Sequence, residues 1–207
     1  MGSHAESRLN YQQLKRETLD SFAAFSQGGS DPAWPAEVFL EVSNLCDLKC
    51  AMCGVFSRLN PNRFTILRQE DRGFMDSDQF DNSLDEILKR ALNVHLFGYG
   101  EPTLHPDFES FVTRMNEYEA MVDFFTNGMS LDQAMCEMLV KNRVHKITIS
   151  FSGCNAQEYD NVYLGGDYHQ VMAGITRLHK VKKASGSRYP LVEINSLAFN
   201  HQVEKLT

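Results

Sequence analysis

The chain has 207 residues, of which 43% are hydrophobic and 23% are charged, and its formal net charge is −7. This length and composition predict one globular domain, with or without an appendage. The negative charge argues against a general binder of nucleic acid or of anionic membranes. No apolar run is long enough to span a membrane and no secretory signal is present, so we expect a cytoplasmic protein with no nucleic-acid or membrane partner.

The N-terminal part of the chain predicts an extension that precedes the main domain. Residues 8–26 carry apolar positions at helical spacing, and the Gly- and Pro-containing residues 28–35 predict a loop. Trp34 in this loop is interpreted as an anchor on the domain. We therefore divide the chain into a helical extension, residues 1–35, and a core domain, residues 36–207.

From residue 36 onward, strand and helix patterns alternate. Strand-like runs rich in β-branched and aromatic residues occupy 37–43, 93–98, 121–126, 144–151 and 190–199. Helical patterns occupy 77–91, 106–119, 130–142, 156–163, 168–183 and the residues from His201 onward. Alternation of this kind predicts an α/β fold with right-handed crossovers and a parallel sheet. It leaves open whether the sheet is doubly wound or a complete or partial barrel.

Three of the five cysteines lie within eight residues directly after the first predicted strand, at Cys46, Cys50 and Cys53. Three thiolates on a four-iron cluster leave one iron open to a non-protein ligand. A structural zinc site needs a fourth protein ligand, and residues 43–61 contain no further Cys and no His. The cluster therefore indicates a metal site that is one protein ligand short. Cys136 and Cys154 are more simply packed or surface residues than ligands.

A glycine-containing turn follows the second predicted strand. Gly98 and Gly100 permit an irregular turn with exposed backbone carbonyls, Glu101 adds a negative charge, and Pro102 leads toward the next helix. This combination suits an ammonium group. No Lys-Ser or Lys-Thr pair follows, so the pattern does not predict a phosphate loop. A plain turn before a helix is the alternative interpretation.

Hydrogen-bonding side chains follow the next two predicted strands. Asn127 lies in a Thr-Asn-Gly turn, and Ser150 and Ser152 close the fourth strand. Their amide and hydroxyl groups suit a ribose or an amino-acid carboxylate, although Asn in such a turn also serves turn formation. Since ligands bind at the carboxyl ends of parallel strands, these motifs predict one shared rim. The basic and polar residues 54–75 predict either a lid or a solvated loop.

Taken in order, these motifs resemble the radical S-adenosylmethionine (radical SAM) superfamily. The resemblance rests on CxxxCxxC, the GYGEP element, TNG and the serine-bearing fourth strand, and it covers about residues 36–207. The stretches LFGYGEPTLHPDF, TNGMSL and ISFSG are similar to the SPASM-type subgroup. The resemblance implies a partial (β/α) TIM-like barrel with about five of six strand–helix units present, so that the core would be incomplete at the C-terminus.

The resemblance also implies a set of site residues. It implies that a [4Fe–4S] cluster is ligated by Cys46, Cys50 and Cys53. It implies that SAM chelates the open iron and is framed by Met52, Gly98, Gly100, Glu101, Pro102, Asn127, Ser150 and Ser152. A flavodoxin- or ferredoxin-type electron donor would reduce the cluster. The resulting 5′-deoxyadenosyl radical would abstract hydrogen from a peptide or small natural-product substrate.

Three positions depart from the family's pattern. Met52 stands where an aromatic residue is usual, and Tyr99 replaces the second glycine of the usual Gly-Gly-Glu-Pro element. Tyr163 lies where related enzymes often carry an arginine for the SAM carboxylate, so that partner is unassigned. The alternative function is an iron–sulfur or zinc binding module without radical chemistry, such as a sensor or a cluster carrier.

Overall fold

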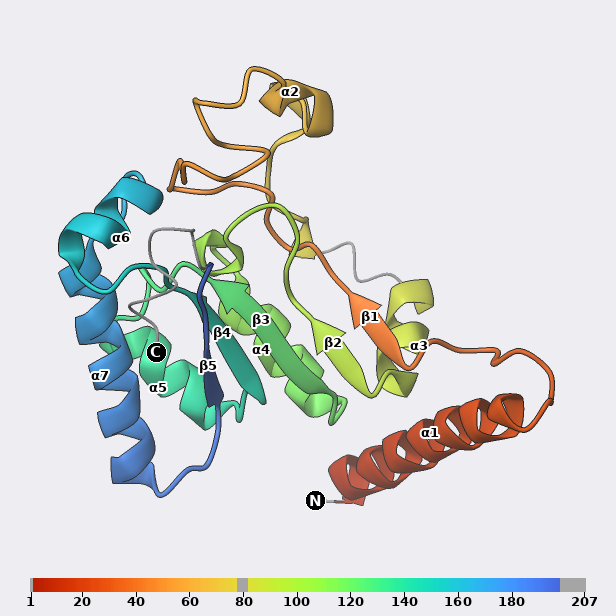
Figure 1. Cartoon of the computed structure of the whole chain (residues 1–207). Coiled ribbons are helices and arrows are strands. Elements are labelled where there is room, and N and C mark those ends of the chain that lie inside the picture. The colour runs from red at the N-terminus through yellow and green to blue at the C-terminus, as the bar shows by residue number, and fades with distance from the viewer. Residues whose placement is uncertain (1, 78–81, 198–207) are drawn as a thin grey trace.

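The computed structural model describes residues 2–77 and 82–197 of the chain (Figure 1). Its helices and strands alternate as the sequence predicts. In chain order they are α1 (Gly2–Ser26), β1 (Glu37–Phe39), α2 (Arg63–Ile66), α3 (Asn82–Arg90), β2 (Asn93–His95), α4 (Phe108–Glu117), β3 (Met121–Thr126), α5 (Gln133–Lys141), β4 (Lys146–Ser150), α6 (Ala156–Val162), α7 (Tyr168–Ser185) and β5 (Leu191–Asn195).

The five strands form one parallel sheet in the order β1-β2-β3-β4-β5. In Figure 1 the connecting helices α3, α4 and α5 lie behind the sheet, and α7 packs against α5 at the left of the sheet. Right-handed crossovers that always advance to the next strand place every helix on the same face, whereas a doubly wound sheet requires a reversal of strand order. The structure therefore confirms the α/β fold and the barrel-type winding, which the family resemblance implied and the strand–helix alternation alone left open.

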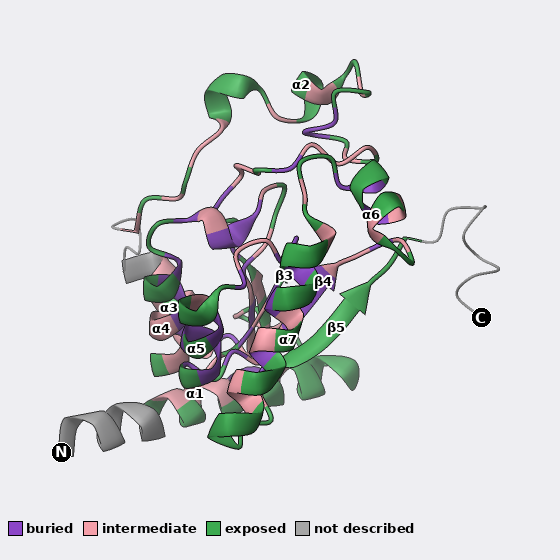
Figure 2. Ribbon diagram, turned by 90° about the vertical axis from the view of Figure 1, so that its left-hand side faces the viewer, coloured by how far each residue is buried: buried purple, intermediate pink, exposed green. Residues whose placement is uncertain are grey.

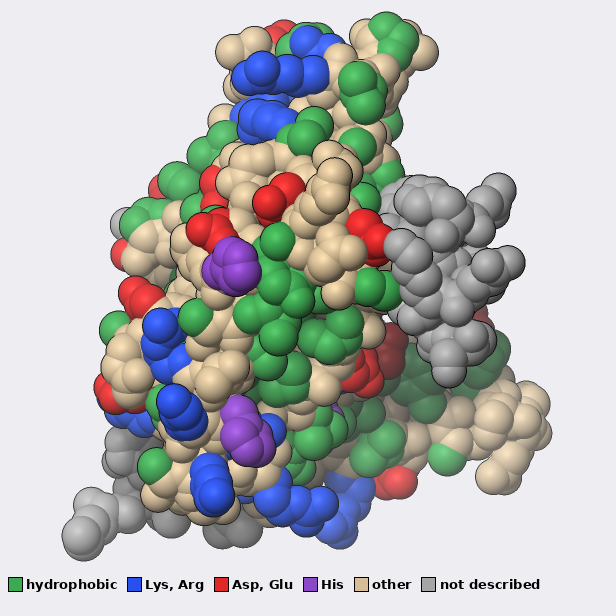
Figure 3. All heavy atoms as spheres, turned by 60° about the vertical axis from the view of Figure 1, so that its left-hand side comes forward, with side chains coloured by type: hydrophobic (Ala, Val, Ile, Leu, Met, Phe, Trp, Pro, Cys, Tyr) green, Lys and Arg blue, Asp and Glu red, His purple; other side chains and the backbone are tan. Residues whose placement is uncertain are grey.

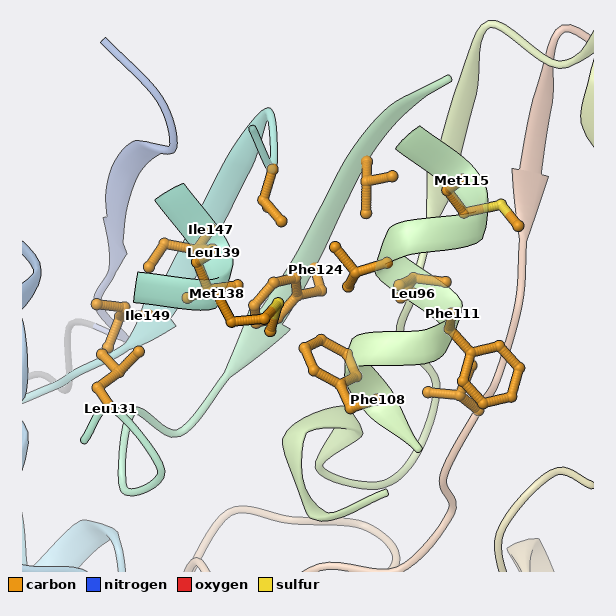
Figure 4. Packing of buried hydrophobic residues seen from close by; sticks show 14 of the residues in the cluster. Leu96, Phe108, Phe111, Met115, Phe124, Leu131, Met138, Leu139, Ile147 and Ile149 are labelled. Carbon is orange, nitrogen blue, oxygen red and sulfur yellow. The ribbon is translucent and has the colours of Figure 1, made fainter. Parts of the chain in front are cut away.

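The hydrophobic core lies between the sheet and this helical layer. The inward-facing residues of β2, β3 and β4 point into it, and Val94, Val122, Phe124 and Ile147 are almost completely buried. In Figure 4 the ring of Phe124 faces that of Phe108 from α4, and the two centroids are 5.1 Å apart in an edge-to-face arrangement. This packing holds the strands in register, so that their carboxyl ends finish at a common rim.

The other face of the sheet has no helical cover among the described residues. It carries a row of aromatic rings, in which Phe39 stacks on His95 and Phe97 packs edge-on against Phe125. All five residues of β5 are exposed (Figure 2). The open face is the concave side that a barrel would enclose.

The observed element boundaries differ from the predicted ones at several places. The first two strands are only three residues long, because the chain turns away from the sheet soon after Phe39 and His95. Pro106 does not lie in the first turn of α4 as predicted, since Asp107 occupies the N-cap and the helix begins at Phe108. Asp132 caps α5, which begins three residues later than predicted, through a 2.8 Å bond from the Met135 amide. The predicted helix from His201 lies outside the described residues.

The N-terminal helix is longer than predicted and packs beside α3. The Lys15 ammonium donates to the Ala91 carbonyl, and the Tyr11 ring meets that of Tyr118 at 5.5 Å. Trp34 lies under the guanidinium of Arg90 at 4.6 Å, as expected for an anchor. The division into an extension and a core domain stays a prediction. Within the described part of the chain, no helix is both long enough and apolar enough to cross a membrane.

Candidate functional site

A cavity of about 250 Å³ opens at the carboxyl ends of the strands. It brings together nine predicted site residues: Cys46, Cys50, Met52, Cys53, Gly98, Gly100, Glu101, Asn127 and Ser150. Pro102 and Ser152 do not line it. Residues separated by about a hundred positions in the sequence thus meet at one rim, as the parallel arrangement of the strands requires.

The cysteine loop, residues 46–53, is held in place by its backbone. The amides of Lys49 and Ala51 donate to the carbonyls of Leu164 and Val162, each at 2.8 Å, which fastens the loop to the end of α6. The Leu48 side chain is buried beneath it. Since these contacts use main-chain groups and Leu48, the three thiol groups are left to face the cavity.

The three thiols do not form a site for a single metal ion. In residues 2–77 and 82–197, no group of three or more His, Cys, Asp or Glu side chains is placed to hold one metal ion. A four-iron cluster differs from a single ion, because each thiolate binds a different iron. Burial raises the pKa of Cys46 to about 12 and that of Cys50 to about 11, so these thiols stay neutral until a metal displaces their protons. The donor set fits a cluster with one open position better than it fits a single zinc ion.

The GYGEP turn lies directly against the start of the cysteine loop. The Glu101 amide donates to the Leu45 carbonyl at 2.7 Å. A Cβ atom on Gly100 would lie 2.5 Å from both the Leu45 and the Ser43 carbonyl oxygens, so no larger residue fits without a shift. Neither glycine of this turn has a positive φ. The glycines are required because the turn packs closely against the residues that precede the cysteines, and not because the backbone is irregular as the sequence suggested.

The Glu101 carboxylate points into the protein and is 3% exposed. It accepts four hydrogen bonds: from the Thr103 amide (3.2 Å), the Thr103 hydroxyl (2.6 Å), the Thr126 hydroxyl (2.8 Å) and the Asn127 amide (2.7 Å). Burial raises the pKa of Glu101, and these bonds oppose the rise. The Glu101 carboxylate is therefore used to join the turn to the end of β3.

Asn127 is tied to the cysteine loop by its side chain. Its amide nitrogen donates to Asp47 Oδ1 at 2.8 Å, and its amide oxygen accepts from the Met129 amide at 2.9 Å. The Cys46 sulfur lies 3.9 Å from the same Asp47 oxygen. A chain of contacts thus runs from Glu101 through Asn127 and Asp47 to a cysteine, and Asp47 is a site residue that no sequence signal indicated.

Ser152 lies behind the wall of the cavity. Its side chain is fully buried, its hydroxyl lies 3.1 Å from that of Tyr163, and it accepts from the Leu197 amide at 2.8 Å. Tyr163, which stands at the position of the expected arginine, lines the cavity and stacks on Tyr159 at 4.7 Å. Ser152 therefore contacts the cavity through Tyr163 and Leu197, which both line it. Pro102 is buried at the start of the short 3₁₀ helix Pro102–Leu104.

Several cavity residues were missed in the sequence. They include Phe56, Tyr99, Phe125, Thr126, Asn195 and Leu197. Asn195 ends the observed β5 and Leu197 follows it, but both lie inside the predicted strand 190–199, so the rim rule applied to that prediction does not find them. Phe125 is next to the buried Phe124 in β3, and successive strand residues point to opposite faces of the sheet. This two-residue period could have placed Phe125 on the face opposite the core.

Comparisons with known proteins agree with this geometry. The family model described as the radical SAM superfamily matches residues 40–196. The tungsten-containing aldehyde ferredoxin oxidoreductase cofactor-modifying protein of Pyrococcus furiosus is 25% identical over 176 residues, which are 82% of this chain and 45% of that protein. The PqqA peptide cyclase of Granulibacter bethesdensis is 25% identical over 129 residues, which are 62% of this chain and 32% of that protein.

Among solved structures, Streptococcus suis SuiB bound to S-adenosylmethionine has a TM-score of 0.63 at 20% identity. The match covers 84% of this chain and 37% of SuiB, and at this identity it shows the fold alone. The chain spans less than half the length of all three of these proteins.

Proposed function

Since the chain belongs to the radical SAM superfamily, we propose that it contributes the site at which a [4Fe–4S] cluster and SAM are held for reductive cleavage. One observation carries this proposal: the three thiols and the GYGEP turn line the same cavity, and among its described lining residues there is no further Cys and no His. When bound and reduced by one electron, the cluster would supply the electron that cleaves SAM to methionine and a 5′-deoxyadenosyl radical.

In this proposal the residues of the chain bind and position. Cys46, Cys50 and Cys53 would hold the cluster, and the backbone carbonyls of the turn would meet the SAM ammonium group. Asn127 and Ser150 line the same cavity and would offer hydrogen bonds to ribose or carboxylate. Met52 would pack against adenine through its polarisable sulfur. No acid–base dyad is required, because these side chains only orient a ligand and exclude water.

Glu101 has an indirect part in this scheme. Its four hydrogen bonds join the turn to the end of β3, which sets the distance between the turn and Asn127. Ser152 and Pro102 support the wall of the cavity from behind. We therefore assign these three residues to positioning.

The substrate class is proposed from the names of the two curated relatives. One is a cofactor-modifying protein and the other a peptide cyclase. Hydrogen abstraction from a peptide or from a small natural product is therefore the proposed outcome. The aromatic row on the open face of the sheet reaches the cavity at Phe125 and offers an apolar path for such a substrate.

The test is anaerobic reconstitution of the full-length protein with iron and sulfide, followed by dithionite and SAM. We expect brown protein and 5′-deoxyadenosine, detected by mass spectrometry. Cys50→Ala serves as the negative control. A protein that reconstitutes and reduces its cluster but forms no 5′-deoxyadenosine would instead be a cluster carrier or sensor, and a colourless protein that retains zinc would be a zinc module.

A further inference from the structure

The segment that follows the cysteines has a charge opposite to that of the rest of the chain. We call residues 54–75 the basic excursion. It projects beyond the carboxyl ends of the strands in both ribbon views (Figures 1 and 2). It contains four arginines and two acidic residues, whereas the whole chain carries −7, so the remaining residues carry −9. An anionic partner would be repelled by most of the molecule and attracted to this segment.

The cations near the excursion are held by aromatic rings. The Arg72 guanidinium lies 4.7 Å from the Phe56 ring centroid, and that of Arg63 lies 4.5 Å from the Phe64 ring centroid. Arg58 is exposed. Among residues 2–77 and 82–197, these three arginines form no ion pair with Asp or Glu, whereas Arg68 is paired with Asp71 at 2.8 Å. Aromatic rings thus hold Arg63 and Arg72 in place, Arg58 is exposed, and no described carboxylate neutralises the three charges.

Apolar side chains are exposed among these cations. Leu59, Phe64 and Ile66 are 72%, 42% and 49% exposed. None of the three lines the cavity. In Figure 3, Lys and Arg side chains gather with hydrophobic ones at the top of the molecule, where the excursion lies. Aromatic residues and arginine are enriched in protein–protein interfaces.

The base of the excursion contacts a proposed cluster ligand. The Phe56 amide donates to the Cys53 sulfur at 3.3 Å, and the Ser57 hydroxyl donates to the Ala51 carbonyl at 2.9 Å. Cys53 itself is only partly buried. A partner on the excursion would therefore come close to the cysteine loop without entering the cavity. An electron carrier needs only this approach, whereas a substrate has to enter.

We propose that the basic excursion is the docking surface for an acidic one-electron carrier of the flavodoxin or ferredoxin class. This inference rests on the proposed function, because only a centre that is reduced in each cycle needs such a carrier. In the transfer, the carrier loses one electron and the cluster gains one, and no covalent bond forms or breaks at this surface.

The experiment compares two double charge reversals in the full-length protein. Arg58→Glu/Arg63→Glu changes the excursion. Lys180→Glu/Lys183→Glu makes the same charge change on exposed residues of α7 and serves as the control. Binding of oxidised flavodoxin is measured by calorimetry at low salt, and 5′-deoxyadenosine formation is measured with reduced flavodoxin and, separately, with dithionite.

We expect the excursion variant to lose flavodoxin affinity about tenfold or more, with a matching fall in the flavodoxin-driven rate at subsaturating carrier. Its dithionite-driven rate should stay at the wild-type value, and the α7 variant should resemble wild type in all three measurements. Raising the ionic strength should weaken wild-type binding, since the attraction is screened.

Equal losses in both variants would overturn the proposal, because net charge alone would then explain them. Unchanged flavodoxin binding in the excursion variant would also overturn it. A third outcome would also overturn it: a poly-glutamate peptide binds the excursion, but adding this peptide leaves the flavodoxin-driven rate unchanged. The surface would then recognise acidic peptides and not the carrier. Calorimetry measures carrier binding at the surface, and the dithionite-driven rate measures the radical chemistry without a carrier. A wild-type protein that binds flavodoxin but never forms 5′-deoxyadenosine therefore contradicts the proposed function and not the docking surface.

Discussion

Two walls of the same cavity are built in opposite ways. In the GYGEP turn, the one strongly polar side chain is buried and accepts four hydrogen bonds from the protein. In the cysteine loop, main-chain groups and Leu48 provide the anchoring, and the three thiols face the cavity. In the first wall the polar side chain stabilises the fold, and in the second wall the thiols remain free to bind a ligand. Mutations in the two walls should therefore separate stability from binding.

The largest effect is expected in the cysteine loop. Changing Cys46, Cys50 or Cys53 singly to Ala should lower the cluster content after reconstitution by more than about tenfold, since even residues that only support metal ligands cost that much when mutated. Visible absorbance and iron content per chain measure this. The apo proteins should unfold close to the wild-type urea midpoint. Cys154→Ala, at an exposed position, should keep the cluster.

For Glu101→Ala in the turn we expect a large loss of stability, in contrast to the cysteine variants. Removing the carboxylate leaves buried donors of Thr103, Thr126 and Asn127 without their acceptor, which should lower the free energy of unfolding by about 3 kcal/mol or more. Urea unfolding of the apo protein measures this loss. The control is Glu109→Ala on the exposed side of α4, which should change stability by less than about 0.5 kcal/mol. If Glu101→Ala unfolds at the wild-type urea midpoint, the two walls do not differ in their contribution to stability.

Gly100→Ala tests the contact between the walls. The added methyl group would lie 2.5 Å from the backbone oxygens of Ser43 and Leu45, just before the cysteine loop, so the two segments have to move apart. We expect a loss of about 2 kcal/mol in unfolding free energy together with reduced cluster content. Gly73→Ala is a matched control, because no atom lies within 4 Å of its added Cβ. Similar losses in both variants would mean that helix or loop propensity, and not close approach, decides the outcome.

The smallest effect is expected at Asp47, which links the two walls through Asn127. Asp47→Ala removes the acceptor of the 2.8 Å bond from the Asn127 side chain and should cost about 1 kcal/mol of stability. It should also weaken SAM binding to the reconstituted protein severalfold, because Asn127 is no longer held. Asp47→Asn keeps an oxygen at this position and should restore most of both losses. Failure of this rescue would show that the charge of Asp47, and not its hydrogen bond, is what counts.

The sequence by itself determined the types and order of the elements, the parallel sheet and the place of the three cysteines. These follow from local signals: the two periods of hydrophobic residues, the caps of helices, and the rule that motifs after parallel strands meet at one rim. The same rule correctly brought nine predicted residues to one cavity.

Only the tertiary structure decided the inward direction of the Glu101 carboxylate and the places of Ser152 and Pro102 outside the lining of the cavity. It alone showed that Asp47 meets Asn127 across 80 residues of sequence. Each of these depends on contact between segments that are far apart in the chain, and residue patterns within one segment carry no information about which distant atoms will be its neighbours.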